Sequence, residues 1–86
     1  MLAAILIPLA LALETTLTAK ALLIITVGLV LIVELMNSAI EAIVDRVSLD
    51  YHELAKRAKD IGSAAVMLSM INCAVVWLLV LWDIFA

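Results

Sequence analysis

Three apolar stretches separated by two polar ones make up the chain. Met1–Leu13 is apolar and ends at Glu14, Ala21–Val33 contains no charge, and Ile61–Trp82 is again uncharged. A helix needs about 20 apolar residues to cross the hydrocarbon core of a bilayer, which is about 30 Å thick. The pattern therefore predicts an all-α integral membrane protein with three transmembrane helices per protomer, the first of them truncated.

The polar positions set the expected boundaries of one membrane domain over residues 1–86. We expect helices over about 1–13, 20–47 and 59–84, with a polar connection over 48–58. The second helix would be about 42 Å long at about 1.5 Å per residue, so one end should project beyond the hydrocarbon core. Its charged C-terminal half is the end that projects.

Basic residues predict the orientation in the membrane. Four of the five lysines and arginines lie between Arg46 and Lys59, which places that connection in the cytoplasm and the C-terminus on the opposite side. Trp77, Trp82 and Phe85, near the end of the third helix, are typical of an aromatic belt at that second membrane face.

Composition supports the membrane assignment and excludes several function classes. Hydrophobic residues make up 69% of the chain, against about 45–50% in soluble domains. No basic patch suits nucleic acid, and the single Cys73 cannot form an internal disulfide. The two glycines, Gly28 and Gly62, do not open a phosphate-binding G-x-x-x-x-G-K loop.

A polar stripe runs along the second helix within the segment ELMNSAIEAIVD. At 100° per residue its members fall within about 100° of one helix face; they are Glu34, Asn37, Ser38, Glu41 and Asp45. Carboxylates are costly in lipid, so the stripe should face other helices or a water-filled cleft. It predicts either a polar seam between helices or a cation or proton site at the membrane–cytoplasm boundary.

A second polar cluster begins the third helix and favours the functional interpretation. Lys56, Arg57, Lys59 and Asp60 precede the small residues Gly62–Ala65, which let helices approach closely. A base, carboxylates, an amide and a lysine are the groups used in Mg²⁺-assisted phosphoryl transfer.

The segments ELMNSAIEAIVDR and YHELAKRAKDIGSAAV resemble the prokaryotic diacylglycerol kinase family, small integral-membrane lipid kinases. The resemblance runs over residues 1–86, is strongest over Glu34–Val66, and looks closer to the Gram-negative diacylglycerol kinases than to the undecaprenol kinases of Gram-positive bacteria. It implies a homotrimer in the bacterial inner membrane. The implied reaction transfers the γ-phosphate of Mg·ATP to diacylglycerol at the cytoplasmic face, giving phosphatidic acid.

The resemblance also implies roles for individual residues. Glu34 looks like the general base that takes the proton of the lipid hydroxyl, and Asn37 like a residue that arranges the site around the γ-phosphate. Ser63 matches a contact to the lipid substrate, and Glu41 looks like the ligand that holds Mg²⁺ against the phosphates. The residues similar to the family's nucleotide contacts are Glu41, Asp50, Tyr51, His52, Lys59 and Asp60.

One departure and three alternatives remain open. The family has a surface helix before its first span, with a further metal-binding glutamate, and we expect this sequence to begin inside that span. A late start codon, a fragment or a short paralogue would each account for this. The alternatives are undecaprenol as the acceptor, a catalytically inactive membrane assembly protein, and a cation-conducting oligomer, against which the Lys59–Asp60 cluster argues.

Overall fold

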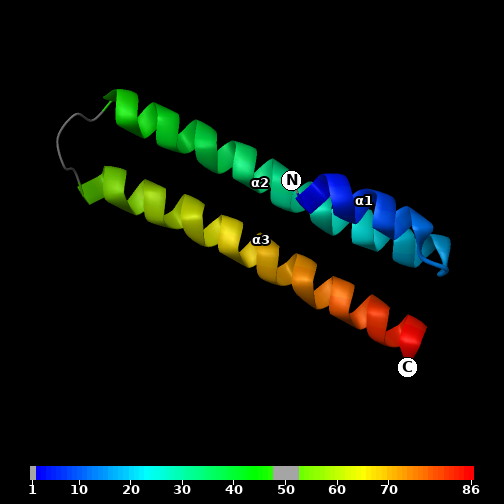
Figure 1. Ribbon diagram of the computed structural model, residues 1–86. Coiled ribbons are helices and arrows are strands. Elements are labelled where there is room, and N and C mark those ends of the chain that lie inside the picture. Colours follow the sequence, from blue (N-terminus) through cyan, green and yellow to red (C-terminus); the bar gives the residue numbers. More distant parts are fainter. Residues whose placement is uncertain (1, 48–52) are drawn as a thin grey trace.

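Three α-helices are present in the computed structural model, which describes residues 2–47 and 53–86. They are α1 (Leu2–Ala12), α2 (Leu17–Val47) and α3 (Glu53–Phe85). Figure 1 shows α3 running antiparallel to α2, and α1 lying against the first half of α2. The described residues include no strand, which confirms the all-helical prediction. The molecule is 52 Å long, so it exceeds the about 30 Å hydrocarbon core of a bilayer.

The turn between α1 and α2 is held by two caps. The Ala19 amide donates to Thr16 Oγ1 at 3.1 Å, which makes Thr16 the N-cap of α2. Lys20 Nζ donates to the Leu11 carbonyl at 3.0 Å, placing a cation at the C-terminal end of α1, where the helix dipole favours it. Because of the Thr16 cap, α2 begins at Leu17 rather than at the predicted residue 20.

The third helix begins six residues earlier than the sequence pattern predicted. Residues 53–58, expected to belong to the connection, form the first turns of α3. Leu54, Ala55, Lys56, Arg57 and Ala58 have high intrinsic helix propensity. Glu53 stands in the first turn, where the helix dipole favours a negative charge. Charge alone made this stretch look like a loop.

Two of the described helices are long and apolar enough to cross a membrane. These are α2 over Leu17–Arg46 and α3 over Glu53–Phe85, whereas α1 has 11 residues. The arrangement fits a helical integral membrane protein. Three membrane crossings per protomer and the trimer stay predictions.

The buried core lies where all three helices meet. It contains Ala10 of α1, Leu23 and Val27 of α2, and Trp77 of α3, with Leu6 among the partly buried side chains around them. The interpretation of Trp77 as a membrane-interface anchor is wrong, because its ring is only 8% exposed.

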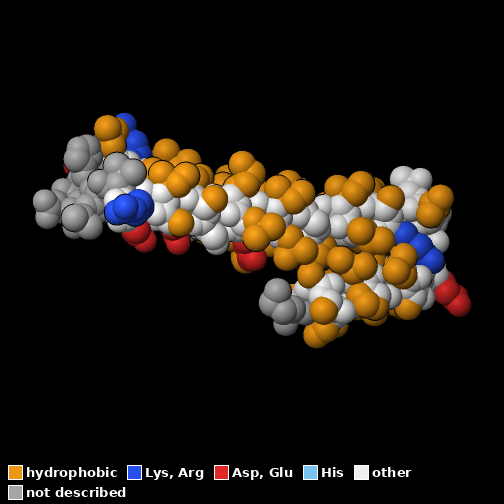
Figure 2. All heavy atoms as spheres, turned by 90° about the horizontal axis from the view of Figure 1, so that it is seen from above, with side chains coloured by type: hydrophobic (Ala, Val, Ile, Leu, Met, Phe, Trp, Pro, Cys, Tyr) orange, Lys and Arg blue, Asp and Glu red, His pale blue; other side chains and the backbone are white. Residues whose placement is uncertain are grey.

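Trp82, Phe85 and most apolar side chains of the described residues lie outside this core. Trp82 and Phe85 are 75% and 76% exposed, as an aromatic belt requires. Figure 2 shows hydrophobic side chains over most of the visible face, with the basic side chains towards the two ends and one acidic side chain near the middle. Such a surface needs lipid or other helices to cover it.

Leu23→Ala should destabilise the chain by about 2–4 kcal/mol, because it empties a site that is fully buried between the helices. The matched control is Leu22→Ala, whose side chain is 46% exposed and should cost much less. Reversible unfolding in mixed micelles measures both changes. Equal losses in the two variants would contradict the packing described for the α1–α2–α3 core.

Candidate functional site

Asn37 is the point at which the polar stripe of α2 meets α3. A Cβ atom added to Gly62 of α3 would overlap Asn37 Oδ1, so only glycine leaves room for the amide there. Asn37 Nδ2 donates to Glu41 Oε1 at 3.4 Å, a long hydrogen bond. Asn37 Oδ1 is buried and has no hydrogen-bond partner among the described residues. At this level the stripe therefore faces α3.

Nearer the connection, an ion pair joins the two long helices. Lys59 Nζ of α3 lies 2.6 Å from Asp45 Oδ1 of α2, and the two side chains are 43% and 64% exposed. Water and salt screen a pair this exposed, so it fixes geometry weakly. Its consequence is local: an ammonium group stands beside the stripe, where an anionic ligand can reach it.

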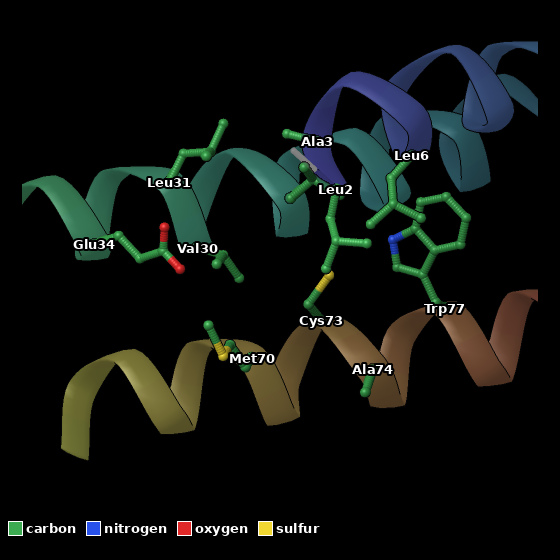
Figure 3. A pocket seen from close by; sticks show the side chains of 11 residues that line it. Leu2, Ala3, Leu6, Val30, Leu31, Glu34, Met70, Cys73, Ala74 and Trp77 are labelled. Atoms are coloured by element: carbon green, nitrogen blue, oxygen red, sulfur yellow. The ribbon is translucent and has the colours of Figure 1, made fainter. Parts of the chain in front are cut away.

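In the opposite direction along α2, Glu34 borders an apolar cavity of about 520 Å³. The cavity is lined from all three helices, and Glu34 is the one charged residue among its lining residues. Figure 3 shows the Glu34 carboxylate pointing from α2 into the space between α2 and α3. One helix face therefore passes from an apolar cavity at Glu34, through the buried contact at Asn37, to the exposed carboxylates of Glu41 and Asp45.

The structure does not bring every predicted site residue to this face. Asp60 lines a shallow depression on α3 together with Lys56 and Arg57, and Ser63 is exposed. Ser38 of the stripe is also exposed. The predicted nucleotide contacts Asp50, Tyr51 and His52 lie outside the described residues, so their roles stay predictions.

The stripe suits a metal ion that arrives with a phosphate ligand. Within residues 2–47 and 53–86, no group of three or more His, Cys, Asp or Glu side chains is arranged to hold a metal. Mg²⁺ in phosphoryl-transfer sites is held by one or two carboxylates together with water and substrate phosphates. Glu41 is exposed and carries one such carboxylate beside Asn37, so the donor set fits shared coordination.

Trp77 and Cys73 form part of the cavity wall, a role that the sequence reading missed. The sequence predicted a membrane-interface position for Trp77 and, for Cys73, only that it forms no internal disulfide. The signal was their spacing with Met70, because residues at i, i+3 and i+7 share one helix face. That face is the one that α3 presents to Glu34.

The sequence model of the family described as "Prokaryotic diacylglycerol kinase" matches residues 1–81. A protein named diacylglycerol kinase from Escherichia coli is 54% identical over 66 residues, which cover 77% of this chain and 54% of that protein. One of the same name from Pseudomonas aeruginosa is 51% identical over 77 residues, covering 90% of this chain and 63% of the relative. The chain thus spans between half and two thirds of the length of these relatives.

Gly62→Ala should destabilise the α2–α3 pair by about 1–3 kcal/mol, since the new methyl group forces the Asn37 amide away from α3. Gly28→Ala is the matched control: nothing lies within 4 Å of its added Cβ. It should leave stability unchanged or raise it by up to about 1 kcal/mol through helix propensity. Reversible unfolding in mixed micelles compares them, and identical behaviour of the two variants would refute the Asn37–Gly62 contact.

Proposed function

This chain belongs to the prokaryotic diacylglycerol kinase family, and we propose that it transfers the γ-phosphate of ATP to the primary hydroxyl of diacylglycerol. The single observation that carries the proposal is the change along one face of α2 from apolar to exposed, polar surroundings. Glu34 borders an apolar cavity, and the exposed Glu41 lies two turns away on the same face, towards the ion pair of Lys59. A lipid and a nucleotide would approach from opposite ends and meet at Asn37.

Glu34 is the general base in this proposal. Its carboxylate accepts a hydrogen bond from the lipid hydroxyl and takes the proton as the hydroxyl oxygen bonds to the γ-phosphorus. The bond from that phosphorus to the bridging oxygen of ATP breaks, and ADP leaves. Positioned proton transfer of this kind contributes about 10²–10⁴-fold to a rate. Support comes from the placement of Glu34 as the one charged lining residue of the apolar cavity.

Glu41, Asn37 and Lys59 bind and orient the phosphates. Glu41 would hold Mg²⁺, which when bound neutralises negative charge on the phosphate oxygens. Asn37 orients the Glu41 carboxylate through its Nδ2, the geometry already present in the structure. Lys59 exchanges Asp45 for the phosphates, an exchange favoured by the exposure of this ion pair. We assign further nucleotide contacts to Asp50, Tyr51, His52 and Asp60, and a lipid contact to Ser63.

We further propose that the reaction takes place at the cytoplasmic face of the bacterial inner membrane, within a homotrimer. The basic residues of 46–59 support the cytoplasmic placement of the connection and leave the C-terminus in the periplasm. A neighbouring subunit would cover Ser38, a polar residue that the stripe leaves exposed. It would also cover part of the exposed apolar surface.

Glu34→Gln should lower kcat for phosphorylation of diacylglycerol by at least about 10²-fold, because the amide cannot take the hydroxyl proton. The measurement is transfer of radiolabelled phosphate from Mg·ATP to diacylglycerol in mixed micelles. Glu14→Gln removes a carboxylate from the α1–α2 turn and serves as the control, with activity kept. Full activity in Glu34→Gln would eliminate Glu34 as the base.

Lys59→Gln should raise KM for ATP by about tenfold or more, since a charge-assisted hydrogen bond to phosphate is lost. KM for the lipid should stay near the parent value, because Lys59 lies on the nucleotide side of Asn37. Lys56→Gln is the charge-matched control, because Lys56 lines a depression that Lys59 does not border. An equal rise of KM for ATP in both variants would show that the loss of one positive charge at this end of α3 causes the effect, rather than the loss of a specific contact from Lys59.

A further inference from the structure

Trp77 carries a buried hydrogen-bond donor that has no use in the chemistry described so far. Its side chain is 8% exposed, and its indole Nε1 has no hydrogen-bond partner within the described part of the chain. Figure 3 shows the nitrogen on the edge of the ring that points towards Leu6 and the cavity. A buried N–H group without an acceptor is destabilising, so most such groups in folded proteins are paired. This one is placed to be paired by a ligand.

Glu34 and Trp77 border the same cavity from two helices. Side chains on a helix lean towards its N-terminus, and α2 and α3 are antiparallel, so these two side chains lean towards each other. Val27, which packs in one cluster with Trp77, lies two turns from Glu34, about 10 Å along the axis of α2. An acceptor and a donor therefore face one apolar space from its two sides.

We propose that Trp77 Nε1 donates a hydrogen bond to an ester carbonyl oxygen of the lipid whose hydroxyl lies at Glu34. The hydroxyl and the ester carbonyls of a diacylglycerol are joined through the short glycerol backbone, so one lipid molecule carries both of the groups that the two side chains would bind. This inference rests on the proposed lipid kinase function and adds a residue that determines specificity.

The pairing selects glycerol esters over other lipid alcohols. A polyprenol and a dialkylglycerol ether both offer a primary hydroxyl and apolar chains, but neither carries a carbonyl. With such a lipid the Trp77 N–H would stay unpaired, and sites built around a hydrogen bond discriminate strongly against ligands that lack it. Beyond Glu34 and Trp77, the residues lining the cavity are apolar apart from the thiol of Cys73. The indole N–H is therefore the main hydrogen-bond donor that the cavity offers to an ester carbonyl.

The first test measures two protein variants and the parent with each of two lipids. Trp77→Phe keeps an aromatic ring and removes the N–H; dioleoylglycerol and the matched dioleyl ether differ only in their carbonyls. We expect Trp77→Phe to lower kcat/KM about tenfold for the ester and to leave the ether unchanged. Trp82→Phe, at a 75% exposed position, is the control and should alter neither. An equal loss for both lipids, or no loss for the ester, overturns the proposal.

A second measurement needs no turnover. In the Trp82→Phe chain, Trp77 is the one remaining tryptophan of the two, so its ¹⁵N-labelled indole gives a single N–H resonance. Without ATP, dioleoylglycerol should move the indole proton downfield and the ether should not. That result with no phosphorylation of any lipid would keep the Trp77 inference and refute the kinase. No shift with the ester, or a lipid-independent shift that grows with protein concentration, overturns the inference in favour of an acceptor on another subunit.

Discussion

The contact between Asn37 of α2 and Gly62 of α3 determines how the two long helices face each other. A polar amide on an otherwise apolar helix cannot face lipid, and here it presses into the space that a missing Cβ leaves on the neighbouring helix. Helical periodicity then sets the rest of the face: with Asn37 directed at α3, Glu34 and Glu41 must follow along the same interface. Lys59, one turn before Gly62, is consequently brought to Asp45.

In the proposed reaction, this arrangement would solve a problem of polarity that any enzyme acting on both a lipid and a nucleotide must solve. The reacting hydroxyl belongs to a molecule that stays in hydrocarbon, whereas the phosphate donor is highly charged and stays in water. A face that begins in an apolar cavity at Glu34 and ends at the exposed Glu41 offers each reactant a suitable environment. Asn37 lies between them, and its buried Oδ1 accepts no hydrogen bond from a described residue.

Periodicity made the polar stripe of α2 predictable from the sequence, but it left open whether the stripe faces other helices or a water-filled cleft, and the resemblance to the family supplied only proposed roles for its members. The start of α3 was missed because its residues are charged, although their helix propensity is high. The burial of Trp77 was not predicted, for a different reason. Burial depends on which helix packs over a residue, and nothing local to Trp77 reveals that α1 contributes to the same core. The ion pair of Asp45 with Lys59 likewise depends on the register between α2 and α3, which no pattern within one helix fixes.

The most direct measurement of the central claim is the proximity of Asn37 to α3 in a lipid bilayer. Solid-state NMR on the chain labelled at asparagine and glycine would record through-space transfer between Asn37 Cγ and Gly62 Cα. Our account predicts a strong cross peak, because the two groups are in van der Waals contact. Its absence, together with transfer from the Asn37 amide to lipid acyl chains, would contradict the account, since the polar face of α2 would then not be joined to α3.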